Sequence, residues 1–178
     1  ELIRMIINGL KAPSDNIFYI SHLSFFDRNR NSAEDWFTSS RVKLLNNAMT
    51  TGIKQLVQTD PQRYKHNAYD HTLPNTNDLS EQFKDLTLSG NQTKSEKGCI
   101  AQGIANRYGV TTVVTGVYWQ LDGKIMITPL VYHNGDITSK EVLPKRKVFC
   151  QDPGGEEMLC PDVDTKITTS VKQLLEDL

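Results

Sequence analysis

Apolar residues recur at steps of three and four positions in several stretches of the chain, which is the spacing of an amphipathic helix. This pattern predicts helices over residues 2–10, 35–58, 95–108 and 165–178, and a shorter one over 79–88. Ser32 is the predicted N-cap of the longest helix, with Asp35 as the acidic partner three residues later.

Short runs rich in β-branched and aromatic residues predict strands over residues 17–26 and 63–69. Residues 110–149 predict an antiparallel meander with strands over 111–121, 124–133 and 137–149. Asp122-Gly123 is the preferred two-residue hairpin turn, and Asn134-Gly135 turns the chain a second time.

The first of these turns also determines which residues face each other. Pairing across it gives two cross-strand pairs, Tyr118 with Ile127 and Trp119 with Met126. Both faces of the resulting sheet are apolar, so we expect other layers to cover it on both sides. Pro129 has no N–H to donate, so we expect an irregular position or a free strand edge near it, where another chain or a second copy can add a strand.

Without the shorter helix at 79–88, the order of predicted elements is α, β, α, β, α, β, β, β, α. This order indicates an α/β (α+β) fold with a mixed sheet of about four strands, which includes the antiparallel meander, and helices on both faces. The 178 residues fit a single domain, 1–178. Within it we assign 1–12 to a leading helix, 17–149 to the core, 150–160 to a loop and 165–178 to a terminal helix.

The composition disfavours several classes of function. Apolar residues make up 38% and charged residues 23% of the chain, which is the balance of an ordinary globular protein. The formal net charge is −1 and the cationic residues are spread along the chain, which argues against nucleic-acid binding and against a polybasic membrane-surface domain. No apolar run approaches the ~20 residues that span a bilayer. No signal peptide is visible at Glu1, as in a mature or trimmed chain.

Three cysteines bear on the cellular compartment. Cys150 and Cys160 enclose nine residues with Pro-Gly-Gly at their centre, so the two sulfurs can meet across a small loop. A disulfide there would indicate an oxidising compartment, and the alternative is two free thiols in a cytosolic protein. Cys99 lies in a helical pattern and is expected to be a small buried apolar residue.

The sequence contains no phosphate loop, dinucleotide fingerprint or nucleophile elbow, and we predict no catalytic residue, no cofactor and no enzymatic activity. His66, Asp70 and His71 are the best candidates for metal ligands, and they would make the chain a metal-dependent hydrolase. A zinc site needs further ligands at a recognisable spacing, so we favour the alternative, in which these are ordinary surface or core side chains.

Arg28, Arg30 and Trp36 are the candidate contact residues for a protein partner. The two arginines lie in the polar segment that follows the first predicted strand. Arginine and tryptophan are enriched at protein interfaces and at their energetic centres. The alternative is a solvated loop beside a core tryptophan.

Two segments of the chain resemble a superfamily of bacterial envelope domains. One comprises the strand at 17–26, its polar tip and the long helix that follows. The other runs from Ile104 through Gly109-Val110 and Thr115-Gly116 to the turn at Asn134-Gly135. Together they resemble, over residues 17–149, the TolB amino-terminal domain, CsgG, LpoB and FlgO.

This resemblance implies a non-enzymatic periplasmic domain, associated with the outer membrane and often carried on a lipid anchor, which here would precede Glu1. Its partners would be proteins of an envelope assembly for secretion, flagellar function or peptidoglycan synthesis. Because the fold family is similar to anticodon-binding modules, RNA binding is a third hypothesis, which the balanced charge disfavours.

Overall fold

The computed structural model describes residues 17–30, 38–66, 102, 106, 112–142, 144 and 147–178, and only the backbone at Leu121. The helices predicted at 2–10 and 79–88 lie outside these residues, as does all but residues 102 and 106 of the helix predicted at 95–108. None of the described helices is long and apolar enough to cross a membrane.

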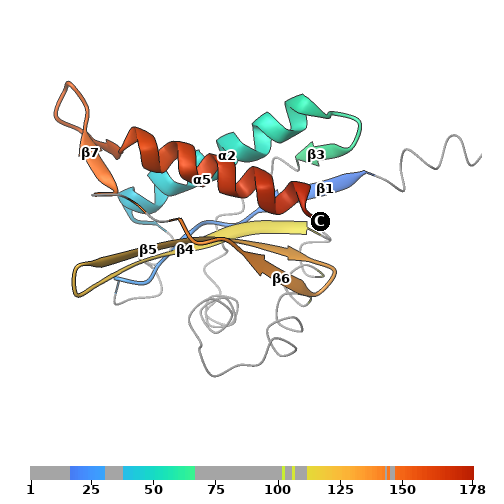
Figure 1. The fold of residues 1–178 in the computed structure, drawn as a ribbon, viewed down its shortest axis with the longest axis horizontal. Helices are drawn as coiled ribbons and strands as arrows, with labels where there is room; N and C mark the ends of the chain where they lie inside the picture. The colour runs from blue at the N-terminus through green and yellow to red at the C-terminus, as the bar shows by residue number, and fades with distance from the viewer. Residues whose placement is uncertain are drawn as a thin grey trace, which may run out of the picture.

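A six-stranded mixed sheet forms the centre of the fold (Figure 1). Its strands are β1 (Phe18–His22), β2 (Phe26–Asp27), β3 (Tyr64–His66), β4 (Thr112–Leu121), β5 (Lys124–His133) and β6 (Asp136–Ser139). The order across the sheet is β3-β1-β4-β5-β6. β2 also pairs with β4, beyond the part of β4 that pairs with β1. β1 runs parallel to β3 and β4, whereas β4, β5 and β6 form the predicted antiparallel meander. The mixed α/β class is confirmed, with more strands than the four or so predicted.

The β4–β5 hairpin has the predicted register. Asp122 and Gly123 have φ angles of 51° and 79°, the left-handed conformation that the expected two-residue turn requires at both positions. Two cross-strand pairs are the predicted ones, Tyr118 with Ile127 and Trp119 with Met126.

Of the two alternatives predicted near Pro129, an irregular position or a free strand edge, the free edge is wrong. β5 lies between β4 and β6, and Pro129 is buried opposite Gly116. The Pro129 carbonyl accepts a hydrogen bond from the Lys140 N–H at 3.3 Å. In an antiparallel ladder the N and O atoms of one residue point to the same side, so the Pro129 nitrogen also faces β6. β6 ends at Ser139, so the N–H that proline lacks would lie just beyond the end of this strand.

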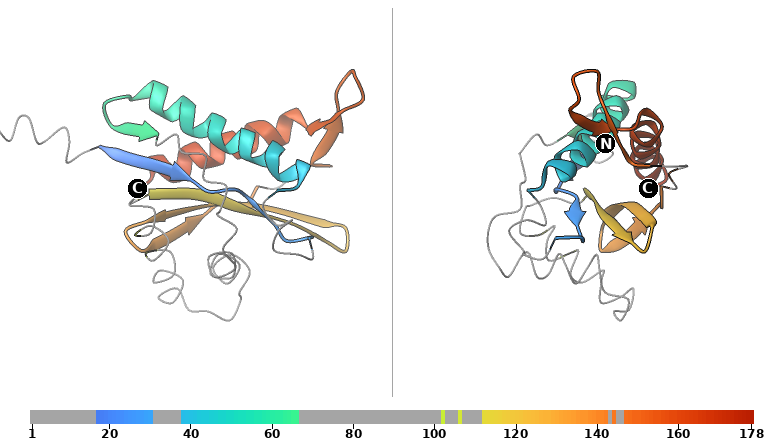
Figure 2. Two further views of the ribbon diagram at one scale, coloured as in Figure 1. Left: turned by 180° about the vertical axis from the view of Figure 1, so that it is seen from behind. Right: turned by 90° about the vertical axis from the view of Figure 1, so that its left-hand side faces the viewer.

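Two helices, α2 (Ser40–Thr59) and α5 (Pro161–Glu176), lie side by side on one face of the sheet (Figures 1 and 2). The main hydrophobic core lies between them and the sheet and takes side chains from all these layers, including Ile20, Ile53, Ile127 and Ile167. The terminal helix begins earlier than residue 165, at Pro161, because proline in a first helical turn loses no hydrogen bond. Its predicted inward residues are all buried, namely Ile167, Val171, Leu174 and Leu175.

The long helix α2 begins at Ser40 rather than at Asp35. Its N-cap is Ser39, whose Oγ accepts a hydrogen bond from the Val42 N–H at 3.2 Å. The predicted cap, Ser32, lies outside the described residues. Both serines have the chemistry of a cap, so the start of the helix could not be decided from residue type alone.

The face of the sheet turned away from α2 and α5 is also buried. Val113, Leu130 and Tyr132 on this face have exposed fractions of 1%, 9% and 1%. Burial raises the pKa of the Tyr132 hydroxyl well above its ordinary value. This part of the second face is therefore covered, as the two apolar faces predict, although both described helices lie on the first face.

The third strand of the meander is shorter than the predicted 137–149. β6 ends at Ser139, and beyond it a single bridge between Ile127 and Val142 continues the pairing. Pro144 follows, and a proline cannot donate to a β-ladder. The chain then forms a separate hairpin of two strands, β7 (Phe149–Gln151) and β8 (Glu157–Leu159).

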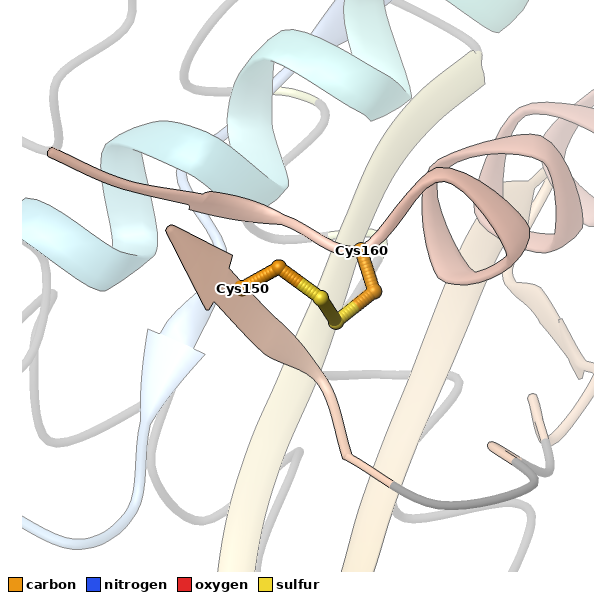
Figure 3. The surroundings of a disulfide bond; sticks show 2 residues. All are labelled: Cys150 and Cys160. Atoms are coloured by element: carbon orange, nitrogen blue, oxygen red, sulfur yellow. A yellow bond between two sulfur atoms is a disulfide. The ribbon is translucent and has the colours of Figure 1, made fainter. Parts of the chain in front are cut away.

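A disulfide joins Cys150 on β7 to Cys160, the residue before α5 (Figure 3). Their Cα atoms are 4.9 Å apart, within the range that a disulfide spans. Arg41 of α2 donates from Nε and Nη2 to the two carboxylate oxygens of Glu157, at 3.0 and 3.2 Å. The disulfide therefore ties the hairpin to α5, and the ion pair ties it to α2.

The strand predicted over 17–26 is interrupted at residues 23–25, between β1 and β2. The Phe25 N–H donates to Asn46 Oδ1 on α2 at 2.7 Å, and Asn46 Nδ2 donates to Ser24 Oγ at 3.0 Å. From the other side, the Thr115 hydroxyl of β4 donates to the Ser24 carbonyl at 2.7 Å. Side chains of α2 and β4 thus satisfy backbone groups that the interrupted strand leaves without a ladder partner.

The ring of Phe25 fills the space over Gly116. A Cβ atom at residue 116 would lie 2.3 Å from Phe25 Cε1, far closer than two non-bonded carbon atoms can approach. The Thr115-Gly116 pair therefore has two roles in one place. Thr115 binds the break in the strand through its hydroxyl, and Gly116 admits the aromatic ring that the break turns inward.

Gly116→Ala is expected to lower the free energy of unfolding by about 1–3 kcal/mol, because the added methyl group overlaps the Phe25 ring. Phe25→Leu removes the ring atoms involved, so the double variant should lose less stability than the sum of the two single changes. Urea unfolding followed by circular dichroism measures all three variants. If the loss of stability in the double variant equals the sum of the two single losses, the Phe25 ring and residue 116 do not interact as described.

Candidate functional site

The turn after β2 is bonded along the end of β4. The Arg28 N–H donates to the Tyr118 carbonyl at 2.9 Å. Asn29 Nδ2 donates to the Gln120 carbonyl at 2.7 Å, and Asn29 Oδ1 accepts from the Gln120 N–H at 2.9 Å. The side-chain amide of Asn29 thus pairs with Gln120 as the backbone of a neighbouring strand would, and the turn becomes an extension of the sheet.

Asp27 holds the same turn from inside. Its side chain is 2% exposed. One carboxylate oxygen accepts from the Asn29 N–H at 3.0 Å, and the other accepts from Ser39 Oγ at 3.1 Å and Arg30 Nε at 3.3 Å. This carboxylate therefore joins the turn to the start of α2, and both of its oxygens accept hydrogen bonds within the protein.

Arg28 lies against an aromatic ring on the surface. Its guanidinium carbon is 3.6 Å from the ring centroid of Trp119, which is cation–π stacking. Trp119 and its cross-strand partner Met126 are both half-buried, on the face turned away from α2 and α5. We call this end of the sheet the tip surface and define it by Arg28, Asn29, Trp119, Gln120 and Met126.

The three contact residues predicted from the sequence have different positions. Arg28 is half-buried on the tip surface, with Trp119 as its aromatic neighbour. Arg30 is 46% exposed and paired with the buried Asp27, so one of its roles is to hold the turn. Trp36 lies outside the described residues. Sequence reasoning missed Trp119 as a surface residue, since its place beside Arg28 depends on the parallel pairing of β2 with β4.

The ionisable groups behind the tip surface keep one charge state near neutral pH. Burial raises the pKa of Tyr118, and the positive charge of Arg41 opposes that shift. The hydrogen bond to Glu157 raises the pKa of Arg41, against the effect of burial. Both pKa shifts lead away from neutral pH, so Tyr118 stays uncharged and Arg41 stays charged there.

The structure brings together two histidines that the sequence did not connect. His22 Nδ1 and His66 Nε2 are 2.9 Å apart, in a partly buried position. Asp70 and His71, the other predicted metal ligands, lie outside the described residues. Among the residues that the structure does describe, no three His, Cys, Asp or Glu side chains gather as metal ligands would.

A hydroxyl–imidazole pair at the opposite end of β4 also resembles a catalytic arrangement. Thr112 Oγ1 and His133 Nδ1 are 2.8 Å apart, and Asn134 Nδ2 is 3.2 Å from His133 Nε2. Thr112 is 0% exposed, so no substrate can reach its oxygen in this conformation. Burial lowers the pKa of His133, and the nearby Asp136 opposes that shift. This pair joins the ends of β4 and β5.

A scan against protein-family models finds no match for the chain, and no curated protein sequence matches it either. The resemblance to bacterial envelope domains therefore stays a prediction.

Asp27→Ala is expected to lower the free energy of unfolding by about 2–4 kcal/mol, because it leaves buried donors around the turn without an acceptor. Asp27→Asn is the matched control and should cost less, since its amide oxygen still accepts from the Asn29 N–H. Guanidinium unfolding midpoints of the two variants give the comparison. Equal stability of Asp27→Ala and the wild type would mean that the turn holds without this carboxylate.

Proposed function

We propose that this chain is a non-enzymatic accessory or scaffold protein of the bacterial periplasm, associated with the outer membrane, and that it binds a protein partner through the tip surface. The observation that carries the proposal is the stacking of Arg28 on Trp119, on a turn bonded to the sheet. A second copy of the chain is the alternative partner.

Pre-organisation makes this pair suited to binding. A long arginine side chain ordinarily loses rotamer freedom when a partner immobilises it. Here the Trp119 ring already holds the Arg28 guanidinium, and Asn29 and Asp27 already hold the backbone that carries it. The guanidinium edge can donate to carboxylates while the ring and Met126 offer apolar area. We therefore infer a partner segment with an acidic residue beside an apolar one.

The proposed location has two supports. The Cys150–Cys160 disulfide closes an ordered hairpin, and such bonds persist in oxidising compartments such as the periplasm. The resemblance to envelope domains, which lies over residues 17–149, also supports a periplasmic location. A lipid anchor before Glu1 would place the domain at the outer membrane, within a secretion, flagellar or peptidoglycan-synthesis assembly.

Site-specific photo-crosslinking tests the binding. Lys124 is exposed and lies two residues before Met126, so its side chain faces the same side of β5. A photoreactive benzoyl-phenylalanine at this position should crosslink one defined protein, in the cells from which the chain comes. Arg28→Met keeps cover over the Trp119 ring but removes the charge, and it should reduce the crosslinked yield about fivefold or more.

Arg63→Met is the matched control, because the Arg63 guanidinium also lies near aromatic rings, 5.3 Å from Phe18 and 5.2 Å from Tyr64, at the other end of the sheet. It should leave the crosslink unchanged. A crosslink that survives Arg28→Met, or equal losses in both variants, would rule out the tip surface. A second experiment in the same cells tests the location. Alkylation of thiols before lysis should leave Cys150 and Cys160 unlabelled, because they form a disulfide. Labelling of both would contradict the periplasmic location but would not bear on the binding proposal.

A further inference from the structure

His22 and His66 end two neighbouring parallel strands. His22 is the last residue of β1 and His66 is the last residue of β3. The two strands are paired in parallel, with Ile20 opposite His66. In open sheets that contain parallel strands, ligands bind at the carboxyl ends of those strands. The pair therefore lies at the edge of the sheet where a ligand site is expected.

The geometry of the two rings brings two ligating nitrogens together. His22 Nδ1 and His66 Nε2 are 2.9 Å apart, the ring centroids are 5.0 Å apart, and the ring planes are inclined at 47°. One of these nitrogens carries the shared hydrogen when both rings are neutral. If that hydrogen moves to the other nitrogen of its own ring, two lone pairs converge on the space between the rings.

A transition-metal ion can bridge these two nitrogens if the rings move. Imidazole nitrogens bind zinc at about 2.0–2.1 Å, so two of them at a tetrahedral angle are about 3.3 Å apart. From their present 2.9 Å the two nitrogens have to separate by a few tenths of an ångström, and the rings have to turn until both lone pairs point at the ion. Imidazole is a preferred ligand of Zn²⁺ and Cu²⁺, whereas Mg²⁺ and Ca²⁺ prefer oxygen.

We propose that His22 and His66 supply two histidine ligands of a site for a divalent late transition-metal ion, Cu²⁺ or Zn²⁺, whose remaining coordination positions are filled by water or by other ligands. This inference is independent of the tip surface, which lies at the end of β2 and β4. It also differs from the metal hypothesis made from the sequence, because the partner of His66 is His22, 44 residues earlier. A bound ion would join the edge strand β3 to β1.

Titration calorimetry with chelator-treated protein that carries no polyhistidine tag tests the site. We expect one equivalent of Cu²⁺ or Zn²⁺ to bind at pH 7.5. His22→Asn and His66→Gln place an amide near the lost ring nitrogen and keep a hydrogen bond possible. Each should weaken binding about tenfold or more.

His133→Asn is the control, because the described partners of His133 are Thr112 and Asn134 rather than a second imidazole. It should leave the affinity unchanged. Electron paramagnetic resonance of the Cu²⁺-loaded wild type gives a readout independent of the variants: hyperfine coupling to two imidazole nitrogens is expected. Coupling to one nitrogen, no saturable binding, or equal affinity in wild type and folded His22 and His66 variants would overturn the proposal.

Discussion

The contact between the Phe25 ring and Gly116 is the constraint on which the rest of this structure depends. The ring lies where any side chain at residue 116 would have to stand. Its place in the core requires the chain to leave the ladder after β1 and to return to it at β2. The interruption is stable because Asn46 and Thr115 bond the backbone around Ser24 and Phe25. β1 pairs His22 with Val114 and β2 pairs Phe26 with Val117, so the interruption shifts the register against β4 by one residue before the turn that carries Arg28.

The beginning of α2 organises the surroundings of that contact. Ser39 donates to the Asp27 carboxylate beneath the tip surface, Arg41 holds the disulfide hairpin through Glu157, and Asn46 bonds the interrupted strand. The N-cap and two residues of this helix therefore hold two segments that are far apart in the sequence, residues 24–27 and the disulfide hairpin. The turn that carries the tip surface is thus bonded both to β4 and to the start of α2.

The parts of the fold that could be predicted are those specified by residues close together in the sequence. The Asp122-Gly123 turn determines the whole β4–β5 register, and the spacing of Ile167, Val171, Leu174 and Leu175 identifies the buried side of α5. Cys150 and Cys160 are close enough in the chain for their pairing to be inferred from the loop between them.

The parts that could not be predicted depend on contacts between distant residues. A run of apolar residues at 17–26 does not encode the break, since the partner that stabilises it is Asn46 on the next helix. The stacking of Arg28 on Trp119 and the approach of His22 to His66 both follow from parallel pairing, which local patterns do not specify. Ser39 and Ser32 are chemically equivalent as caps, and tertiary bonds to Asp27 favour the former.

Native-state hydrogen exchange tests most directly the claim that the tip surface is a rigid extension of the sheet. The N–H groups of Arg28 and Gln120 donate to Tyr118 and Asn29 within this turn. We expect these N–H groups to exchange as slowly as amides inside β4 and β5, because exchange at either place requires the sheet to open. Exchange as fast as that of the exposed turn at Asn134-Gly135 would contradict this claim and leave Arg28 on an ordinary solvated loop.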